Sequence, residues 1–402
     1  MIEIPAAARP LSVLVFTPTP THPPVQGNRQ RVFDICRALE SVGARLTLLY
    51  YATESIGAAE ARRMREAWGD IHIVFPRGVL HKQSLVRYPA IDDWYDEAIT
   101  QAVAELCKER RFDVCIVNYV WYSRLFEALP SSAVRVIDTH DIFGGRSERF
   151  AEIGLAPEWF HTSIAQEGLG LDRSDFVLAI QSGERGPLQA RTRARVRTLG
   201  FLSAPNFLPP PVPRNGGSLR AGYIGSGNPF NVASMLAFAG AVNASPQLIP
   251  SVEFHVAGQI CTALKGVRHP FLLRGTTESV AAFYESIDVA INPMMGGTGL
   301  KIKSLEALSF GMPLVATADA MTGIPSAHPG HLLAGPAEIA DRLLALARDP
   351  ARLRQESEAS RQVFGAYRRS QLDAFRHIWS EISEEVSTRE LVYANKATES
   401  CA

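Results

Sequence analysis

The stretch that most constrains the fold is residues 288–317, which read DVAINPMMGGTGLKIKSLEALSFGMPLVAT. Both ends are apolar runs of the length of a buried strand. Between them, apolar residues from Ile302 to Leu308 recur at helical spacing, and Gly311 and Pro313 then end the helix. The stretch therefore predicts a strand, a loop, a helix and a second strand.

The loop before this helix carries few side chains, because it consists of Gly296, Gly297, Thr298, Gly299 and Leu300. Backbone N–H groups at a helix N-terminus are unpaired, and the helix dipole favours negative charge there. A merely structural turn has no need of three glycines so close together. The loop therefore predicts a phosphate site.

Lys301 and Lys303 lie at the start of the same helix, where the dipole disfavours positive charge unless an anion is bound. Glu306 follows one turn after Lys303, so its carboxylate can accept hydrogen bonds from the hydroxyls of a ribose. An ordinary solvated Lys303–Glu306 ion pair is the alternative for this spacing. Together with the glycine loop, the pair favours a nucleotide diphosphate.

The string GGTGLKIKSLEALSFGMPLVAT resembles the nucleotide-sugar signature of GT-B glycosyltransferases, in particular retaining family four. The resemblance implies that Glu306 binds the nucleotide ribose and that the loop through Gly297, Gly299 and Leu300 binds the diphosphate of the donor. Many members carry a glutamate where this chain has Thr298. That departure leaves the identity of the sugar and the anomeric outcome open.

Length and composition indicate a two-domain globular protein of 402 residues, with 46% hydrophobic and 20% charged residues. The 41 basic and 41 acidic side chains cancel, which argues against a general nucleic-acid binder. The five cysteines are scattered and predict neither disulfides nor a zinc site. Without a signal-peptide pattern or a membrane-spanning run, we expect a cytoplasmic protein, and peripheral contact with the inner membrane face stays open.

The first half of the chain alternates apolar strands with amphipathic helices. Continuous apolar runs, as opposed to alternating ones, predict a parallel sheet covered on both faces. The expected strands are 11–17, 45–51, 71–76, 113–119, 134–138 and 176–181, and the longer expected helices are 90–110 and 157–173. After the first strand, Gly27, Asn28 and Arg29 begin a helix at the edge where open α/β sheets bind ligands. They predict an acceptor or phosphate loop, and a helix start with a solvated arginine is the alternative.

The strand 134–138 ends in a polar cluster, DTHDIFGGR, that includes His140 and Asp141. An imidazole beside carboxylates can orient a sugar hydroxyl or balance developing charge, in its neutral or protonated form. A capped helix start with a structural histidine is the alternative. The cluster resembles the family-four element whose histidine contacts the donor sugar, so His140 and Asp141 are the candidate catalytic residues.

Four arginines alternate with other residues between positions 191 and 197, and an extended segment would place them on one face. They are Arg191, Arg193, Arg195 and Arg197. An acidic lipid surface or a phosphorylated acceptor would fit such a face, and a solvated strand is the alternative.

The proline-rich segment 206–217 predicts a linker between an N-terminal domain, 1–205, and a second domain, 218–367. A terminal helix at about 368–388 is expected to pack back on the first domain, with a loose tail after it. In the second domain, the strand 220–224 leads to Gly225 and GSGNPFN, which by resemblance is the opposite side of the diphosphate site. The fold class is α/β: the GT-B architecture, two Rossmann-like domains facing a cleft.

The predicted function is transfer of a sugar from a nucleotide diphosphate sugar to a glycan, lipid-linked or small-molecule acceptor, with retention. No cofactor is expected, and no metal, because no carboxylate cluster stands out and lysines can neutralise the leaving diphosphate. Two rivals stay open. One is an epimerase or hydrolase of nucleotide sugars, and the other is a non-catalytic nucleotide-sugar binder, which Thr298 would suit.

Overall fold

The computed structural model describes residues 9–24, 26–78, 82–152, 154, 160–211, 217–277, 279–296 and 299–399. The chain forms two compact units. Unit 1 comprises Met1–Leu202 and Gln371–Ala402, and unit 2 comprises Ser203–Ser370.

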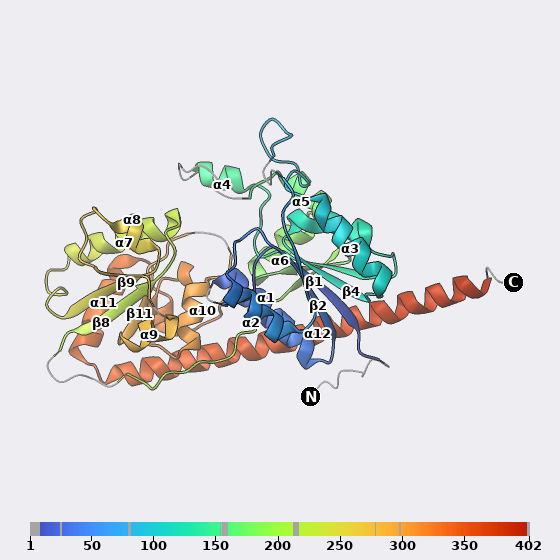
Figure 1. The fold of residues 1–402 in the computed structure, drawn as a ribbon. Coiled ribbons are helices and arrows are strands. Elements are labelled where there is room, and N and C mark those ends of the chain that lie inside the picture. The colour runs from blue at the N-terminus through green and yellow to red at the C-terminus, as the bar shows by residue number, and fades with distance from the viewer. Residues whose placement is uncertain are drawn as a thin grey trace. The chain divides into compact units, whose positions relative to one another are not determined.

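Unit 1 is built on a seven-stranded parallel sheet in the order β3-β2-β1-β4-β5-β6-β7. Figure 1 labels three of its neighbouring strands, β2, β1 and β4. All the strands expected from continuous apolar runs are present, with ends that differ by one or two residues. The strands are β1 Ser12–Thr17, β2 Arg45–Tyr51, β3 Ile71–Val74, β4 Val114–Asn118, β5 Val134–Asp138, β6 Phe176–Ala179 and β7 Arg195–Thr198. The helices are α1 Gly27–Ser41, α2 Ala58–Trp68, α3 Glu97–Glu109, η1 Val120–Ala128, α4 Arg146–Glu152, α5 Ile164–Leu171 and α6 Ser182–Gln189.

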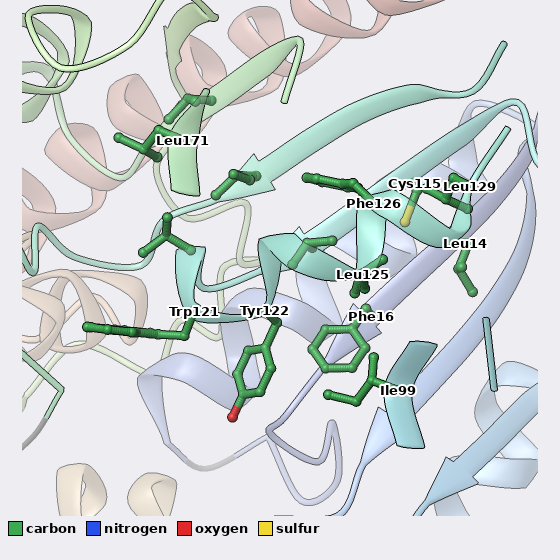
Figure 2. Packing of buried hydrophobic residues seen from close by; sticks show 14 of the residues in the cluster. Leu14, Phe16, Ile99, Cys115, Trp121, Tyr122, Leu125, Phe126, Leu129 and Leu171 are labelled. Atoms are coloured by element: carbon green, nitrogen blue, oxygen red, sulfur yellow. The ribbon is translucent and has the colours of Figure 1, made fainter. Parts of the chain in front are cut away.

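Both faces of this sheet are covered by apolar side chains, as continuous strand runs require. On one face, Leu14 and Phe16 of β1 pack with Trp121 and Leu125 of η1 (Figure 2). On the other face, side chains of β1, α1 and α2 share a cluster with the last helix. The sheet is therefore a buried platform, and only its strand ends are open to build a site.

Two expected helices of unit 1 begin later than predicted. The helix expected at 90–110 starts only at Glu97, because Asp96 caps it by accepting a hydrogen bond from the N–H of Ala98. The helix expected at 157–173 is α5, which begins at Ile164 and is capped by Ser163. In both cases a capping side chain decides the boundary, which apolar spacing does not reveal.

The end of the chain is also different from the prediction. One 48-residue helix, α12, runs over Arg352–Glu399, where a separate helix at about 368–388 and a loose tail were expected. From Gln371 onward this helix belongs to unit 1, and Phe375, Ile378 and Trp379 are buried in its core. The expectation of a loose tail is wrong because helical backbone continues through Glu399.

Unit 2 contains a five-stranded parallel sheet in the order β10-β9-β8-β11-β12. Within residues 288–317 the predicted order of elements is present: strand β11, a loop, helix α10 and strand β12. The strands are β8 Leu219–Ile224, β9 Val252–Ala257, β10 Leu272–Gly275, β11 Val289–Asn292 and β12 Leu314–Ala316. The helices are α7 Pro229–Asn243, α8 Ile260–Leu264, α9 Val280–Glu285, α10 Ile302–Ser309, η2 Asp319–Met321, η3 Pro329–His331 and α11 Pro336–Arg348.

In the part of the chain that the structure describes, no helix is both long enough and apolar enough to cross a membrane.

Candidate active site

In unit 1 the predicted residues follow strands whose carboxyl ends share one edge of the sheet. Strands β1 and β4 are neighbours, and the sheet grows outward from them in both directions. Such a switch in strand order opens a crevice at the carboxyl ends, where α/β folds bind ligands. Asn118 ends β4 and His140 follows β5, so tertiary structure brings them to this edge.

His140 is held in one orientation by its neighbours. Its Nε2 lies 2.8 Å from Oδ1 of Asn118, and its ring stacks on Tyr119 with 4.2 Å between centroids. Both His140 and Tyr119 have positive φ, 60° and 70°. Non-glycine residues rarely adopt this conformation, and when they do they cluster at functional sites.

Burial lowers the pKa of His140 to about 4, an effect that Arg31 adds to and Asp138 opposes. The imidazole is therefore neutral at neutral pH, which selects one of the two forms that the sequence left open. The amide of Asn118 donates to the carbonyl of Phe16, so its Oδ1 is the atom that accepts from Nε2 of His140. That assignment leaves Nδ1 of His140 as a hydrogen-bond acceptor.

Asp138 is fully buried and bound by Arg31, a residue that the sequence analysis did not single out. Nε of Arg31 lies 2.8 Å from Oδ2 of Asp138, and Nη2 lies 2.5 Å from Oδ1. The same guanidinium donates to the carbonyls of Leu199 and Gly200. Its position four residues before Ile35, on the apolar side of α1, was the signal that could have revealed a buried charge.

Asp141 is partly exposed at the start of the next loop. Its Oδ1 accepts from the backbone N–H of Ile142 at 2.8 Å, and its Oδ2 lies 3.5 Å from Nη1 of Arg146. Glu184, in the first turn of α6, is a second carboxyl group at this edge. Burial, followed by the carboxylate of Asp141, raises the pKa of Glu184 to about 8.

The predicted acceptor or phosphate loop at Gly27, Asn28 and Arg29 offers less positive charge to a ligand than the sequence suggested. Asn28 accepts the backbone N–H of Arg29 at 2.9 Å, and its amide lies 3.4 Å from Oγ1 of Thr19. The guanidinium of Arg29 is paired with Glu54. Helix α1 begins at Gly27 without a side-chain cap or an acidic residue in its first turn. Its N-terminal N–H groups, more than Arg29, are what this loop offers an anion.

In unit 2 the two predicted donor loops meet at a second switch in strand order. Strands β8 and β11 are neighbours, so the loop that starts at Gly225 and the loop before α10 leave from adjacent strand ends. A Cβ atom on Gly225 would lie within 2.9 Å of the ring of Tyr223, so only glycine fits there. The sequence prediction that these loops form one site is consistent with this geometry.

The loop before α10 is stabilised from several sides. The N–H of Gly296 donates to Oδ2 of Asp319 at 2.7 Å, and Nζ of Lys301 lies 3.2 Å from the carbonyl of Gly296. Gly299 has φ +76°, and the side chain of Leu300 is buried beneath it. Gly297 and Thr298, both predicted donor-binding residues, lie outside the described residues.

Helix α10 has an open N-terminus, because it has no side-chain cap and no acidic residue in its first turn. Lys301 occupies the N-cap position and is buried. Lys303 follows in the first turn, with its Nζ 3.4 Å from Oε1 of Glu306. The ion pair weighed as an alternative therefore exists, and it lies beside the N-terminus of a helix, where backbone N–H groups attract an anion.

Glu306 is fixed at one of its two carboxylate oxygens. The hydroxyl of buried Tyr284 donates to Oε1 at 3.1 Å, the same oxygen that Lys303 approaches. Burial, followed by the charge of Glu306, holds the pKa of Tyr284 well above its usual value, so the phenol stays a donor. Among the described residues none donates to Oε2, which is the oxygen that a ligand hydroxyl could reach.

A hollow of about 890 Å³ lies at the opposite edge of the sheet of unit 1. It is lined by ion pairs between described residues, such as Arg9 with Asp113 and Arg110 with Asp70. The candidate site residues lie at the other ends of the strands, so this hollow is not part of the candidate site. Within the described ranges, no three His, Cys, Asp or Glu side chains are grouped as metal ligands.

Comparison with known proteins shows what this chain is similar to. A family model described as glycosyl transferases group 1 matches residues 220–349, the segment that carries both predicted donor loops. Solved structures match nearly the whole chain. Residues 220–349 are thus similar to a group 1 glycosyltransferase domain, and the chain has the GT-B fold. No curated protein matches the chain.

Three solved structures illustrate the likeness of this GT-B chain. A sucrose-phosphate synthase from Thermosynechococcus elongatus is 15% identical with a TM-score of 0.62, over 96% of this chain and 100% of that one. HepE from Anabaena, in complex with UDP and glucose, is 12% identical with a TM-score of 0.56, over 96% and 100%. A mutant of S. aureus TarM, in complex with UDP and other ligands, is 11% identical with a TM-score of 0.60, over 93% and 99%. At such identities the likeness establishes the fold alone.

Proposed function

We propose that the protein transfers a sugar from a nucleoside diphosphate sugar to an acceptor, with retention as in family four, in the synthesis of a glycan, polysaccharide or glycoconjugate. The observation that carries the proposal is the start of α10. There an open helix N-terminus, two lysines and a half-anchored Glu306 follow a glycine loop in the segment that matches group 1 glycosyltransferases.

In unit 2, the helix N–H groups with Lys301 and Lys303 bind the diphosphate, and Oε2 of Glu306 accepts a hydrogen bond from the ribose. We also assign donor binding to Gly297, Thr298, Gly299 and Leu300 and to the loop at Gly225. Fixed donors aimed at the leaving diphosphate stabilise the charge that develops on it. Because lysines supply that positive charge, we propose transfer without a metal ion or cofactor.

In unit 1, Nδ1 of neutral His140 accepts a hydrogen bond from a hydroxyl of the donor sugar. Asp141 and the N-terminus of α1, from Gly27 to Arg29, belong to the same binding surface. The acceptor is a glycan, a lipid-linked sugar or a small molecule. The location we propose is the cytoplasm, with peripheral contact at the inner membrane face where the acceptor is lipid-linked.

UDP sugars are the first donors to test, because HepE and TarM structures contain UDP. Thermal unfolding of wild type and of Glu306→Ala is measured with saturating UDP, GDP, ADP and TDP. At a hundred times the dissociation constant, a ligand adds about 2.7 kcal/mol to the stability of the unit that binds it.

One diphosphate should stabilise the wild type, and Glu306→Ala should lose most of that response. Glu285→Ala, an exposed carboxylate in the same unit, is the matched control and should respond like wild type. If no diphosphate stabilises the wild type, the proposed donor site is wrong.

A further inference from the structure

Glu184 is buried at the carboxyl edge of the unit 1 sheet, although it lies on the first turn of a short helix. It follows β6, the neighbour of the strand that leads to His140, and is 4% exposed. Glutamate is rarely buried unless it is paired. Its place beside the candidate active site therefore needs an explanation.

Glu184 does not perform the usual task of a glutamate at this helix position. A carboxylate three residues after the N-cap normally reaches back to accept the N-cap N–H. Here the N-cap side chain, Gln181, accepts from the N–H of Gly183 at 3.0 Å. Both carboxyl oxygens of Glu184 are buried and accept no hydrogen bond from the described residues. A polar group buried in this way destabilises the fold unless something binds it.

Four charged side chains act on Glu184, and each already has a partner. Arg31 of α1 is taken by Asp138, and Arg149 of α4 donates to the carbonyls of Ile142 and Gly144. Glu167 of α5 accepts the N–H of Phe143 and is paired with Arg191. Asp141 contacts Arg146. Both arginines that act on Glu184 therefore already have other partners among the described residues.

The ionisation of Glu184 follows from these surroundings. Burial, with the carboxylates of Asp141 and Glu167, raises the pKa to about 8, and Arg31 and Arg149 oppose the rise. At neutral pH the group is therefore mostly a neutral carboxyl, which donates one hydrogen bond and accepts another. That pattern matches a hydroxyl group and does not match a cation, which needs a carboxylate.

We propose that the carboxyl group of Glu184 binds a hydroxyl group of a neutral sugar acceptor at the carboxyl edge of unit 1, next to Asp141. The inference rests on the proposed function, because it names the residue that holds the second substrate. It makes Glu184 an acceptor-binding residue that leaves the nucleotide site of unit 2 untouched.

Two substitutions separate this role from a structural one. Glu184→Gln keeps the size and remains able to donate and accept, and Glu184→Met keeps the length and can do neither. Because an apolar side chain replaces an unsatisfied carboxyl group, Glu184→Met should raise the melting temperature by about 3–6 °C. Loss of a merely structural hydrogen bond would lower it.

Transfer is measured from the sugar nucleotide whose diphosphate stabilises the wild type. The acceptor probes are glucose, galactose, mannose, N-acetylglucosamine and their methyl glycosides. For the acceptor that wild type uses, Glu184→Met should lower kcat/KM by about 30–100-fold. Glu184→Gln should stay within about tenfold of wild type and should lack the decline above pH 8 that ionisation of Glu184 causes. The dissociation constant of the diphosphate should be the same in all three proteins.

Glu66→Gln, an exposed carboxylate of α2, is the control and should behave as wild type. The inference is overturned if Glu184→Met uses the acceptor as well as wild type does, or if wild type accepts none of these sugars. If no diphosphate binds wild type, the proposed function itself fails. If wild type binds a diphosphate but the Glu184 substitutions do not change transfer to the acceptor, the inference about Glu184 is wrong and the proposed function stands.

Discussion

The two carboxyl edges of this protein build their sites in opposite ways. In unit 2 most candidate groups are backbone N–H groups and side chains between Gly296 and Glu306, and the neighbouring loop adds Gly225. In unit 1 they are buried side chains from separate segments, among them Arg31, Asn118, His140 and Glu184. The first is a local construction, and the second is a tertiary one.

This difference separates stability from binding. A partly exposed lysine at a helix N-terminus, such as Lys303, can be changed at little cost to the fold, because solvent replaces what is lost. A buried network of charged and polar side chains is costly to change, because removal of one member leaves another buried without its partner. We therefore expect substitutions in unit 2 to appear in affinity, and those in unit 1 to appear first in stability and pH dependence.

The largest effect is expected for the buried ion pair of unit 1. Asp138→Asn leaves Arg31 buried without a counter-charge, and should lower the free energy of unfolding by about 3–5 kcal/mol. Urea denaturation measures this. Glu40→Gln, which breaks an exposed pair with Arg37 on the same helix as Arg31, should cost less than about 1 kcal/mol. Equal losses for the two variants would contradict the contrast between buried and exposed charge.

The next effect is an opposed pH dependence of two groups in unit 1. The pKa of His140 is lowered to about 4, so its neutral form favours the fold and this stability is lost as pH falls from 6.5 towards 4. The pKa of Glu184 is raised to about 8, so its protonated form favours the fold and this stability is lost as pH rises from 4.5 towards 8.

Unfolding free energies of wild type, His140→Gln and Glu184→Gln between pH 4 and 8 test both signs. As pH rises from 4.5 towards 8, the unfolding free energy of Glu184→Gln should increase relative to that of wild type, by about 1.4 kcal/mol per pH unit in the middle of this range. As pH falls from 6.5 towards 4, the unfolding free energy of His140→Gln should increase relative to that of wild type. Parallel curves for the three proteins would show that neither group titrates on unfolding.

A smaller effect is expected at the start of α10. Lys303→Met removes a positive charge beside the proposed diphosphate and should weaken diphosphate binding about tenfold at low salt, and less at high salt. The free energy of unfolding should hardly change, because the side chain is partly exposed. Isothermal titration calorimetry gives the affinity. Lys265→Met, an exposed lysine of the same unit, should bind as wild type does.

The smallest effect is expected for the alternating arginines, since each is paired with a carboxylate within unit 1. Arg197 contacts Glu381, Arg195 contacts Glu385 and Arg193 contacts Asp172. Arg197→Gln should cost less than about 1 kcal/mol. Co-sedimentation with phosphatidylserine vesicles should be the same for wild type and the variant. A loss of vesicle binding would revive the idea of a lipid-binding face.

Sequence reasoning succeeded where structure is local. The parallel strands follow from continuous apolar runs, and the loop and helix at 296–309 follow from glycines, a helical period and a stop at Gly311. Sequence reasoning was less accurate where a capping side chain or tertiary packing sets the boundary of a helix. The cap by Asp96 makes α3 begin later than apolar spacing predicts. Packing of Trp379 in the core of unit 1 accompanies one continuous helix α12, where a separate helix at about 368–388 was expected.

By itself the sequence determined the α/β class and the composition of the glycine loop before α10, because strand periodicity, glycine content and helix signals act over a few residues. Only the tertiary structure decided the ionisation of His140 and Glu184, the pairing of Arg31 with Asp138 and the neutralisation of the arginine face. These depend on burial and on partners up to 190 positions away in the chain, as for Arg195 with Glu385. Charge and desolvation act through space, so residue order alone does not specify them.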